Sequence, residues 1–130
     1  MKHVKDMVRA ANAAIECIPA ADARALLDQK DVVFVDLRDI RELEREGVIP
    51  GAFHCPRGML EFWIDPESPY AKAVFQEPKR FVFYCQSGWR SALSTKTAQD
   101  MGLARVAHIS DGFTGWKQAG GATAQKPAKG

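Results

Sequence analysis

The chain has 130 residues, the length of one ordinary domain, and its 46% apolar and 26% charged residues are typical of a globular protein. Eighteen basic and sixteen acidic side chains leave a formal net charge of +2, which gives no reason to expect a nucleic acid or a membrane surface as partner. No apolar run approaches the ~18 residues of a membrane span, and the charged N-terminal stretch is a poor secretory signal. We therefore expect a cytoplasmic protein.

The first half of the chain predicts alternating helices and strands. Residues 1–17 are expected to form a helical extension, because apolar side chains from Val4 to Ile15 recur at helical spacing. Pro19 can open a helix over 20–28. The apolar run VVFVD over 32–36 is typical of a strand buried on both faces. A short charged helix that ends at Gly47 and a strand over 52–55 follow.

The second half continues the alternation after one irregular segment. Residues 57–80 carry three prolines and four aromatic residues, and we expect two short helical turns separated by a loop, with most of the aromatic side chains in the core. The last part of the chain predicts a strand over 81–84, a helix over 91–101, a strand over 106–109, a helix over 113–119 and a frayed tail over 124–130.

This alternation predicts an α/β domain with a small, mainly parallel sheet flanked by helices on both faces. In such sheets, ligands bind beyond the carboxyl ends of the strands. Cys85 directly follows the predicted strand over 81–84, so it lies where chemistry is expected.

The residues that follow Cys85 favour a reactive thiolate. A tight turn before a helix N-terminus directs backbone N–H groups inward, where they can hold an anion, and Gly88 permits the backbone angles that such a turn needs. Arg90 adds a positive charge. We predict Cys85 and Arg90 as the catalytic residues, and the substrate-binding residues as Gln86, Ser87, Gly88, Trp89 and Ser91.

The segment CQSGWRS at 85–91 resembles the active-site loop of the rhodanese family of sulfurtransferases. Three further elements resemble the motifs of that family: Asp36-Leu37-Arg38 with Glu42, GVIPGAFH at 47–54, and the closing run at 112–120. The resemblance covers roughly residues 18–123, which we take as the domain, and it implies the rhodanese-like fold. Two positions depart from the family pattern. Asp111 stands where glycine is usual, and Trp89 is bulkier and more apolar than the residues common there.

The resemblance implies sulfur transfer in two displacements. The Cys85 thiolate takes the outer sulfur of a donor such as thiosulfate, and a thiol or cyanide then removes it from the Cys85 persulfide. A protein could also be the acceptor. This mechanism implies no cofactor or metal, and a zinc site is not expected, because the sequence has no C-x-x-C pair and its three histidines lack ligand spacing. Cys17 and Cys55 are expected to be inert, His54 to be a scaffold residue, and Asp36, Arg38 and Glu42 to form structural ion pairs.

Two alternatives remain open at this point. The chain could be a non-enzymatic persulfide carrier or interaction module that serves one protein partner. It could also be a cysteine phosphatase, which uses a similar loop on a similar fold. The spacing of Cys85 and Arg90 favours sulfur transfer over phosphate chemistry. Four residues separate the cysteine and the arginine here, and the family resemblance implies five in the phosphatase loops.

Overall fold

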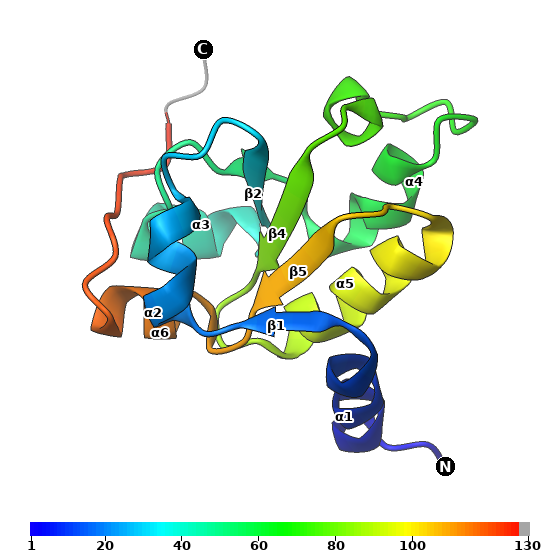
Figure 1. Ribbon diagram of the computed structural model, residues 1–130, viewed down its shortest axis with the longest axis horizontal. Helices are drawn as coiled ribbons and strands as arrows, with labels where there is room; N and C mark the ends of the chain where they lie inside the picture. The colour runs from blue at the N-terminus through cyan, green and yellow to red at the C-terminus, as the bar shows by residue number, and fades with distance from the viewer. Residues whose placement is uncertain (128–130) are drawn as a thin grey trace.

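The structure, a computed structural model, describes residues 1–127 and contains one five-stranded parallel sheet of order β1-β5-β4-β2-β3. The strands are β1 (Glu16–Ile18), β2 (Val32–Asp36), β3 (Phe53–His54), β4 (Arg80–Tyr84) and β5 (Val106–Ile109). Helices cover both faces of this sheet (Figure 1). The predicted α/β class with a parallel sheet is therefore confirmed.

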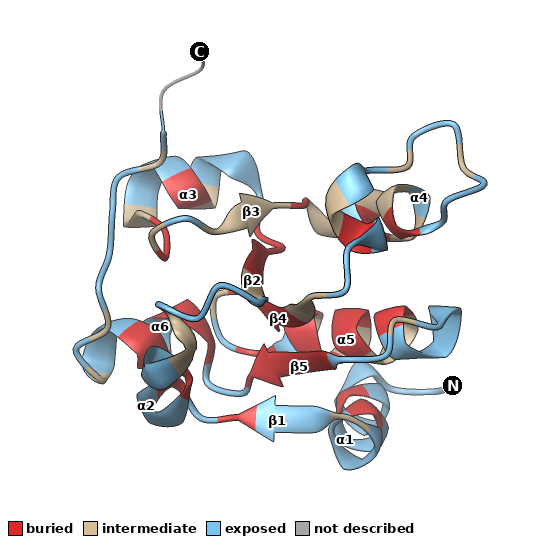
Figure 2. Ribbon diagram, turned by 45° about the horizontal axis from the view of Figure 1, so that its top comes forward, coloured by how far each residue is buried: buried red, intermediate tan, exposed pale blue. Residues whose placement is uncertain are grey.

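Apolar side chains explain the two layers of helices. Successive residues of a strand point to opposite faces, so in β4 the side chains of Val82 and Tyr84 join one core cluster and those of Phe81 and Phe83 join the other. The first cluster packs beneath α2 (Ala20–Ala23) and α6 (Gly112–Gln118). The second packs beneath α4 (Leu60–Ile64) and α5 (Trp89–Met101). Figure 2 shows the central strands as the most buried part of the molecule.

Several predicted boundaries differ from the structure. The helix expected over 20–28 is the short α2 followed by the 3-10 turn η1 (Arg24–Leu26). The helical extension α1 (Val4–Ala14) ends before residues 16–18, which form the unpredicted edge strand β1. Only Ile18 of that strand is buried, so its sequence carries little apolar signal.

The remaining elements agree closely with expectation. The charged helix is α3 (Ile40–Glu46), and Asp39 caps it by accepting a hydrogen bond from the Arg41 amide at 2.9 Å. The irregular segment contains, besides α4, the two 3-10 turns η2 (Arg57–Met59) and η3 (Ala73–Gln76). The expectation that most of its aromatic side chains lie in the core is wrong, because Phe75 is buried but Phe62 and Tyr70 are 52% and 59% exposed.

The C-terminal stretch stays attached to the domain as far as residue 124. Ala124 exchanges two backbone hydrogen bonds with Val48, of 2.8 and 2.9 Å. The expected tail over 124–130 thus has its first residue on the domain, and its last three residues lie outside those described. Within residues 1–127, we find no helix with the length and apolar character needed to cross a membrane.

Candidate active site around Cys85

The sheet brings Cys85 to its carboxyl edge, between the two central strands. β2 and β4 are neighbours in register, with Asp36 opposite Tyr84, so the segments that follow them emerge side by side. The chain proceeds from β2 to β3 on one side and from β4 to β5 on the other. This is the switch point at which open α/β sheets bind ligands.

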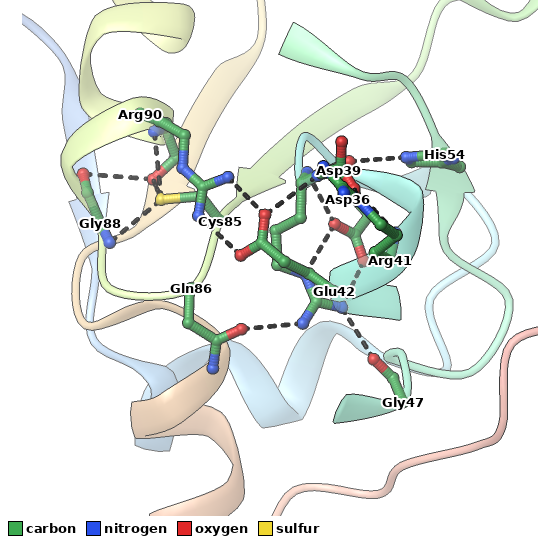
Figure 3. A network of polar contacts seen from close by, with 12 residues as sticks. Asp36, Asp39, Arg41, Glu42, Gly47, His54, Cys85, Gln86, Gly88 and Arg90 are labelled. Atoms are coloured by element: carbon green, nitrogen blue, oxygen red, sulfur yellow. Dashed lines mark hydrogen bonds and ion pairs between the residues drawn. The ribbon is translucent and has the colours of Figure 1, made fainter. Parts of the chain in front are cut away.

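The sulfur of Cys85 receives backbone hydrogen bonds from the start of α5. The amide of Gly88 donates to Sγ at 3.1 Å and the amide of Ser91 donates at 3.4 Å (Figure 3). Both the N–H groups and the dipole of a 13-residue helix favour a negative charge at this position. The Cys85 side chain is nearly inaccessible, with 1% exposure, so a thiolate there would be shielded from bulk water.

Gly88 makes the turn between Cys85 and α5 possible. Its φ is +108°, in the region that favours glycine, and a Cβ at this position would overlap the carbonyl oxygen of Ser110. The loop is therefore pressed against the end of β5. α5 begins at Trp89, two residues earlier than predicted, so Trp89 and Arg90 lie in its first turn and not in the loop.

The opposite side of the loop is fixed by α6. The amides of Phe113 and Thr114 donate to the carbonyl oxygens of Cys85 and Gln86 at 2.9 and 3.1 Å. The Gln86 side chain donates to the hydroxyl of Thr114 at 3.0 Å and accepts from Arg38 at 2.9 Å. Gln86 therefore clamps the loop between two elements, a role beyond the predicted substrate contact.

Arg38 is the centre of a buried polar network beside the loop. Its side chain is 0% exposed and is paired with Asp36, whose exposure is 1%, at 2.7 Å. The guanidinium also donates to the carbonyl of Gly47 at 2.8 Å and lies 4.4 Å from the ring centroid of Phe113. The predicted structural ion pair of Asp36 and Arg38 is present, and the hydrogen bond from Arg38 to Gln86 connects it to the loop.

Glu42 pairs with Arg90 and not with Arg38, contrary to the expected grouping. Two hydrogen bonds of 2.7 and 2.9 Å join the guanidinium of Arg90 to the two carboxylate oxygens of Glu42. The capping box of α3 fixes Glu42, which also accepts from the amide of Asp39 at 3.1 Å. The hydrogen bonds from Arg90 lower the pKa of Glu42, so the pair is ionised at neutral pH. The loop's predicted positive charge is therefore largely offset.

The remaining residues singled out from the sequence are either exposed, buried without a catalytic contact, or held in structural hydrogen bonds. Trp89 is 51% exposed at the helix start, and Ser87 is also exposed. Cys55 is buried, and desolvation raises its pKa to about 12. His54 donates from Nε2 to the carbonyl oxygen of Arg38 at 2.7 Å, which is a scaffold contact. Asp111 accepts from the amide of Ala20 at 2.8 Å and so anchors the start of α2.

His108, which lies beside the predicted residue Ser91, was not predicted as part of the site. Ser91 lies 3.5 Å from the sulfur of Cys85 through its hydroxyl, and that hydroxyl lies 2.8 Å from Nδ1 of His108. Both side chains are fully buried. A histidine inside the apolar strand VAHI was the available signal, because a buried polar group needs a partner.

The sequence and the fold of this chain have counterparts in known proteins. The chain matches the family described as Rhodanese-like domain over residues 19–119. It belongs to the rhodanese-like family. The fold and the family that the sequence predicted are thus confirmed.

Curated relatives of this rhodanese-like chain are longer than the chain itself. A protein of Mus musculus named thiosulfate sulfurtransferase/rhodanese-like domain-containing protein 3 is 27% identical over 100 residues, which cover 73% of this chain and 64% of that protein. The tRNA uridine(34) hydroxylase of Cronobacter sakazakii is 31% identical over 100 residues, which cover 75% of this chain and 27% of the hydroxylase. The chain therefore spans less than two thirds of the length of either relative.

Solved structures include close matches to this rhodanese-like domain. A Rhodopseudomonas palustris protein of unknown function, described as a possible tyrosine phosphatase, is 60% identical with a TM-score of 0.93, covering 95% of this chain and 96% of its own. The polysulfide-sulfur transferase homodimer of Wolinella succinogenes is 28% identical with a TM-score of 0.70, covering 94% and 87%. The family and these neighbours support a role in sulfur transfer or a related reaction.

Proposed function

We propose that this protein is a sulfurtransferase that carries a sulfane sulfur as a persulfide on Cys85. The observation that supports this most directly is the position of the Cys85 sulfur, which accepts backbone N–H donors from Gly88 and Ser91 at the N-terminus of α5. Such preorganised donors stabilise negative charge on sulfur without any rearrangement during the reaction.

The reaction is two displacements at sulfur. The Cys85 thiolate attacks the outer sulfur of a donor such as thiosulfate, a new S–S bond forms, and the old S–S bond breaks with its electron pair leaving on sulfite. An acceptor such as cyanide or a thiolate then attacks the outer sulfur of the persulfide. The S–S bond to Cys85 breaks, and its electron pair returns the Cys85 thiolate.

Mass spectrometry of the intact protein tests the first displacement. After incubation with thiosulfate and removal of the excess, the wild-type chain should be heavier by one sulfur, and cyanide should remove that sulfur as thiocyanate. Repeated turnover with both reagents would indicate an enzyme. A persulfide that forms but is not released to small acceptors would favour the carrier alternative. No persulfide from thiosulfate, polysulfide or a low-molecular-weight persulfide would contradict the proposal.

The Arg90–Glu42 pair bears on the choice of donor. Because the carboxylate of Glu42 offsets the guanidinium, the site offers little net positive charge to the thiosulfate dianion. Trp89 adds exposed apolar surface next to it. We therefore propose that thiosulfate is a poor donor and that a less charged or protein-borne persulfide is preferred.

Trp89→Lys should increase kcat/KM for thiosulfate by roughly five-fold, the effect of about 1 kcal/mol of added attraction at an exposed site. The gain should shrink as salt is added, because exposed charges are screened. Trp89→Gln is the matched control, since it removes the ring without adding charge, and it should show no salt-dependent gain. Equal rates for the two variants at low salt would contradict this account.

The phosphatase alternative is disfavoured by the same ion pair. A phosphoryl group would have to compete with the Glu42 carboxylate for Arg90, which is already held by two hydrogen bonds. Asp111 and Asp65 are the acids that could act as proton donors for a phosphatase, and both already accept hydrogen bonds elsewhere. Asp111 accepts from the Ala20 amide, and Asp65 accepts from the Glu67 amide at 2.9 Å. A phosphoester's leaving alkoxide usually needs such a donor.

We expect p-nitrophenyl phosphate hydrolysis to stay at the level of the Cys85→Ala variant. Vanadate and phosphate should leave alkylation of Cys85 by iodoacetamide almost unchanged, whereas a persulfide donor should change the mass of the modified peptide. Cys85-dependent phosphate release well above background would replace the sulfurtransferase assignment with the phosphatase one.

A further inference from the structure

A chain of polar contacts leads from Cys85 to α1, a helix outside the segment that matches the family. The Ser91 hydroxyl lies 3.5 Å from the sulfur of Cys85 and 2.8 Å from Nδ1 of His108. The other ring nitrogen, Nε2, lies 2.9 Å from Oδ1 of Asn12 on α1. The family match begins only at residue 19, so Asn12 belongs to the extension.

These contacts fix the direction of each hydrogen bond. The Asn12 oxygen can only accept, so Nε2 of His108 must carry a proton. Desolvation lowers the pKa of His108 to about 4, so the imidazole is neutral at neutral pH and Nδ1 holds a lone pair. The Ser91 hydroxyl must therefore donate its proton to His108. Its oxygen lone pairs then face the sulfur of Cys85.

This arrangement keeps a strong donor away from the thiolate. A hydroxyl at the first turn of α5 would otherwise donate to the Cys85 anion in a charge-assisted hydrogen bond. With that hydroxyl engaged by His108, the side-chain contribution of Ser91 is lost and only the backbone donors of Gly88 and Ser91 remain. A less stabilised thiolate is a stronger nucleophile and a poorer leaving group.

We propose that Asn12 and His108 are positioning residues that withhold the Ser91 hydroxyl from the Cys85 thiolate and so balance the loading of sulfur against its release. The proposal rests on the sulfurtransferase function proposed above. It gives the N-terminal helix α1 a part in the chemistry, because Asn12 selects the tautomer of His108.

Other ionisable groups lie near Cys85 and near Asn12, at the two ends of this row of polar contacts. Around Cys85 they are Arg90 with Glu42, and Arg38 with Asp36, which reach the loop through Gln86. At the far end, the thiol of Cys17 lies 3.4 Å from Oδ1 of Asn12, and Glu16 is beside it. Substituting Asn12 leaves the ionisable groups around Cys85 unaltered. Cys17 is removed from the test by working in a Cys17→Ala, Cys55→Ser background.

The first test is Asn12→Leu in that background. Leucine fills the space of asparagine and removes the acceptor, so the His108 proton should move to Nδ1. The Ser91 hydroxyl then has two acceptors within reach, the carbonyl oxygen of Gly88 at 3.3 Å and the sulfur of Cys85 at 3.5 Å. It should turn to the sulfur, because a thiolate is charged and accepts a stronger hydrogen bond than a neutral carbonyl. The ultraviolet absorbance of the Cys85 thiolate, followed against pH, should then show a roughly tenfold larger ionisation constant. Arg9→Leu, an exposed position on the same helix, should leave the titration unchanged.

The two half-reactions should respond in opposite directions. At a pH where Cys85 is fully ionised in every variant, Asn12→Leu should slow persulfide formation by about three-fold and speed the release of sulfur to cyanide. Adding Ser91→Ala should abolish both changes, because the hydroxyl that moves is then absent. An unchanged or smaller ionisation constant in Asn12→Leu, or half-reactions that change in the same direction, would overturn the proposal.

A measurement on the unaltered protein keeps the proposal testable if a variant fails to fold. Nitrogen-15 NMR of histidine-labelled wild-type protein should show His108 as the neutral Nε2–H tautomer at neutral pH. The Nδ1–H tautomer or an imidazolium would overturn the proposal. If the tautomer and the titration are as expected but no persulfide forms from any donor, then the proposed function fails and the positioning of Ser91 does not.

Discussion

Replacing Cys85 with alanine should reduce sulfur transfer from thiosulfate to cyanide on the order of a thousand-fold or more, because no other thiol can take over as nucleophile. Cys55 is buried, and desolvation raises its pKa to about 12, so it stays protonated at neutral pH. Cys17 is exposed on β1, and its pKa is raised by desolvation and by Glu16.

The matched controls for this prediction are Cys17→Ser and Cys55→Ser, both of which should keep most of the activity. Circular dichroism and the urea midpoint of each variant should be compared with the wild type, so that loss of fold is separated from loss of chemistry. A natively folded Cys55→Ser protein without activity would contradict the single-cysteine mechanism.

Arg38→Met should lower the free energy of unfolding by about 3–5 kcal/mol, the cost of leaving a buried charge without its partner. The variant keeps most of the side-chain volume but leaves the Asp36 carboxylate unpaired at 1% exposure. It also removes the hydrogen bonds to the carbonyl of Gly47 and to Gln86. The midpoint and slope of urea unfolding, followed by tryptophan fluorescence, would measure the change.

Arg41→Met is the control for that prediction, because Arg41 makes the same kind of pair on the surface. Its contact with Asp39 is 3.1 Å long, but the two side chains are 82% and 51% exposed. Such a pair contributes about 0–1 kcal/mol. If Arg38→Met were as mild as Arg41→Met, the network around Arg38 would not stabilise the fold as we argue. Replacing Asp36 and Arg38 together with apolar residues should recover part of the loss.

Local patterns in the sequence predicted the central strands and the cysteine loop. The runs VVFVD and FVFY are apolar because β2 and β4 are covered on both faces, and Cys85 followed from its place after the second run. β1 was missed because it is a short edge strand with one buried residue. The early start of α5 was missed because Gly88 alone marks the turn, and the two residues after it are already helical.

The contacts that shape the site could not be predicted in the same way. Arg38 meets Gln86 across 48 positions of sequence, and His108 meets Asn12 across 96. Nothing in the local pattern of one segment specifies which distant polar group will satisfy it. The family resemblance suggested that Asp36, Arg38 and Glu42 act together, but the fold divides them, since α3 directs Glu42 to Arg90 instead.

The hydrogen bonds from the α6 amides to the carbonyls of Cys85 and Gln86 have a consequence for the entropy of binding. Fixing the backbone of one residue costs ~1–2 kcal/mol in conformational entropy. In this protein the loop is already held by α6 and by Arg38, so that cost falls on folding and not on each encounter with a donor. Association with a small donor should therefore be limited by the donor's own loss of motion and by the release of water, and not by ordering of the protein.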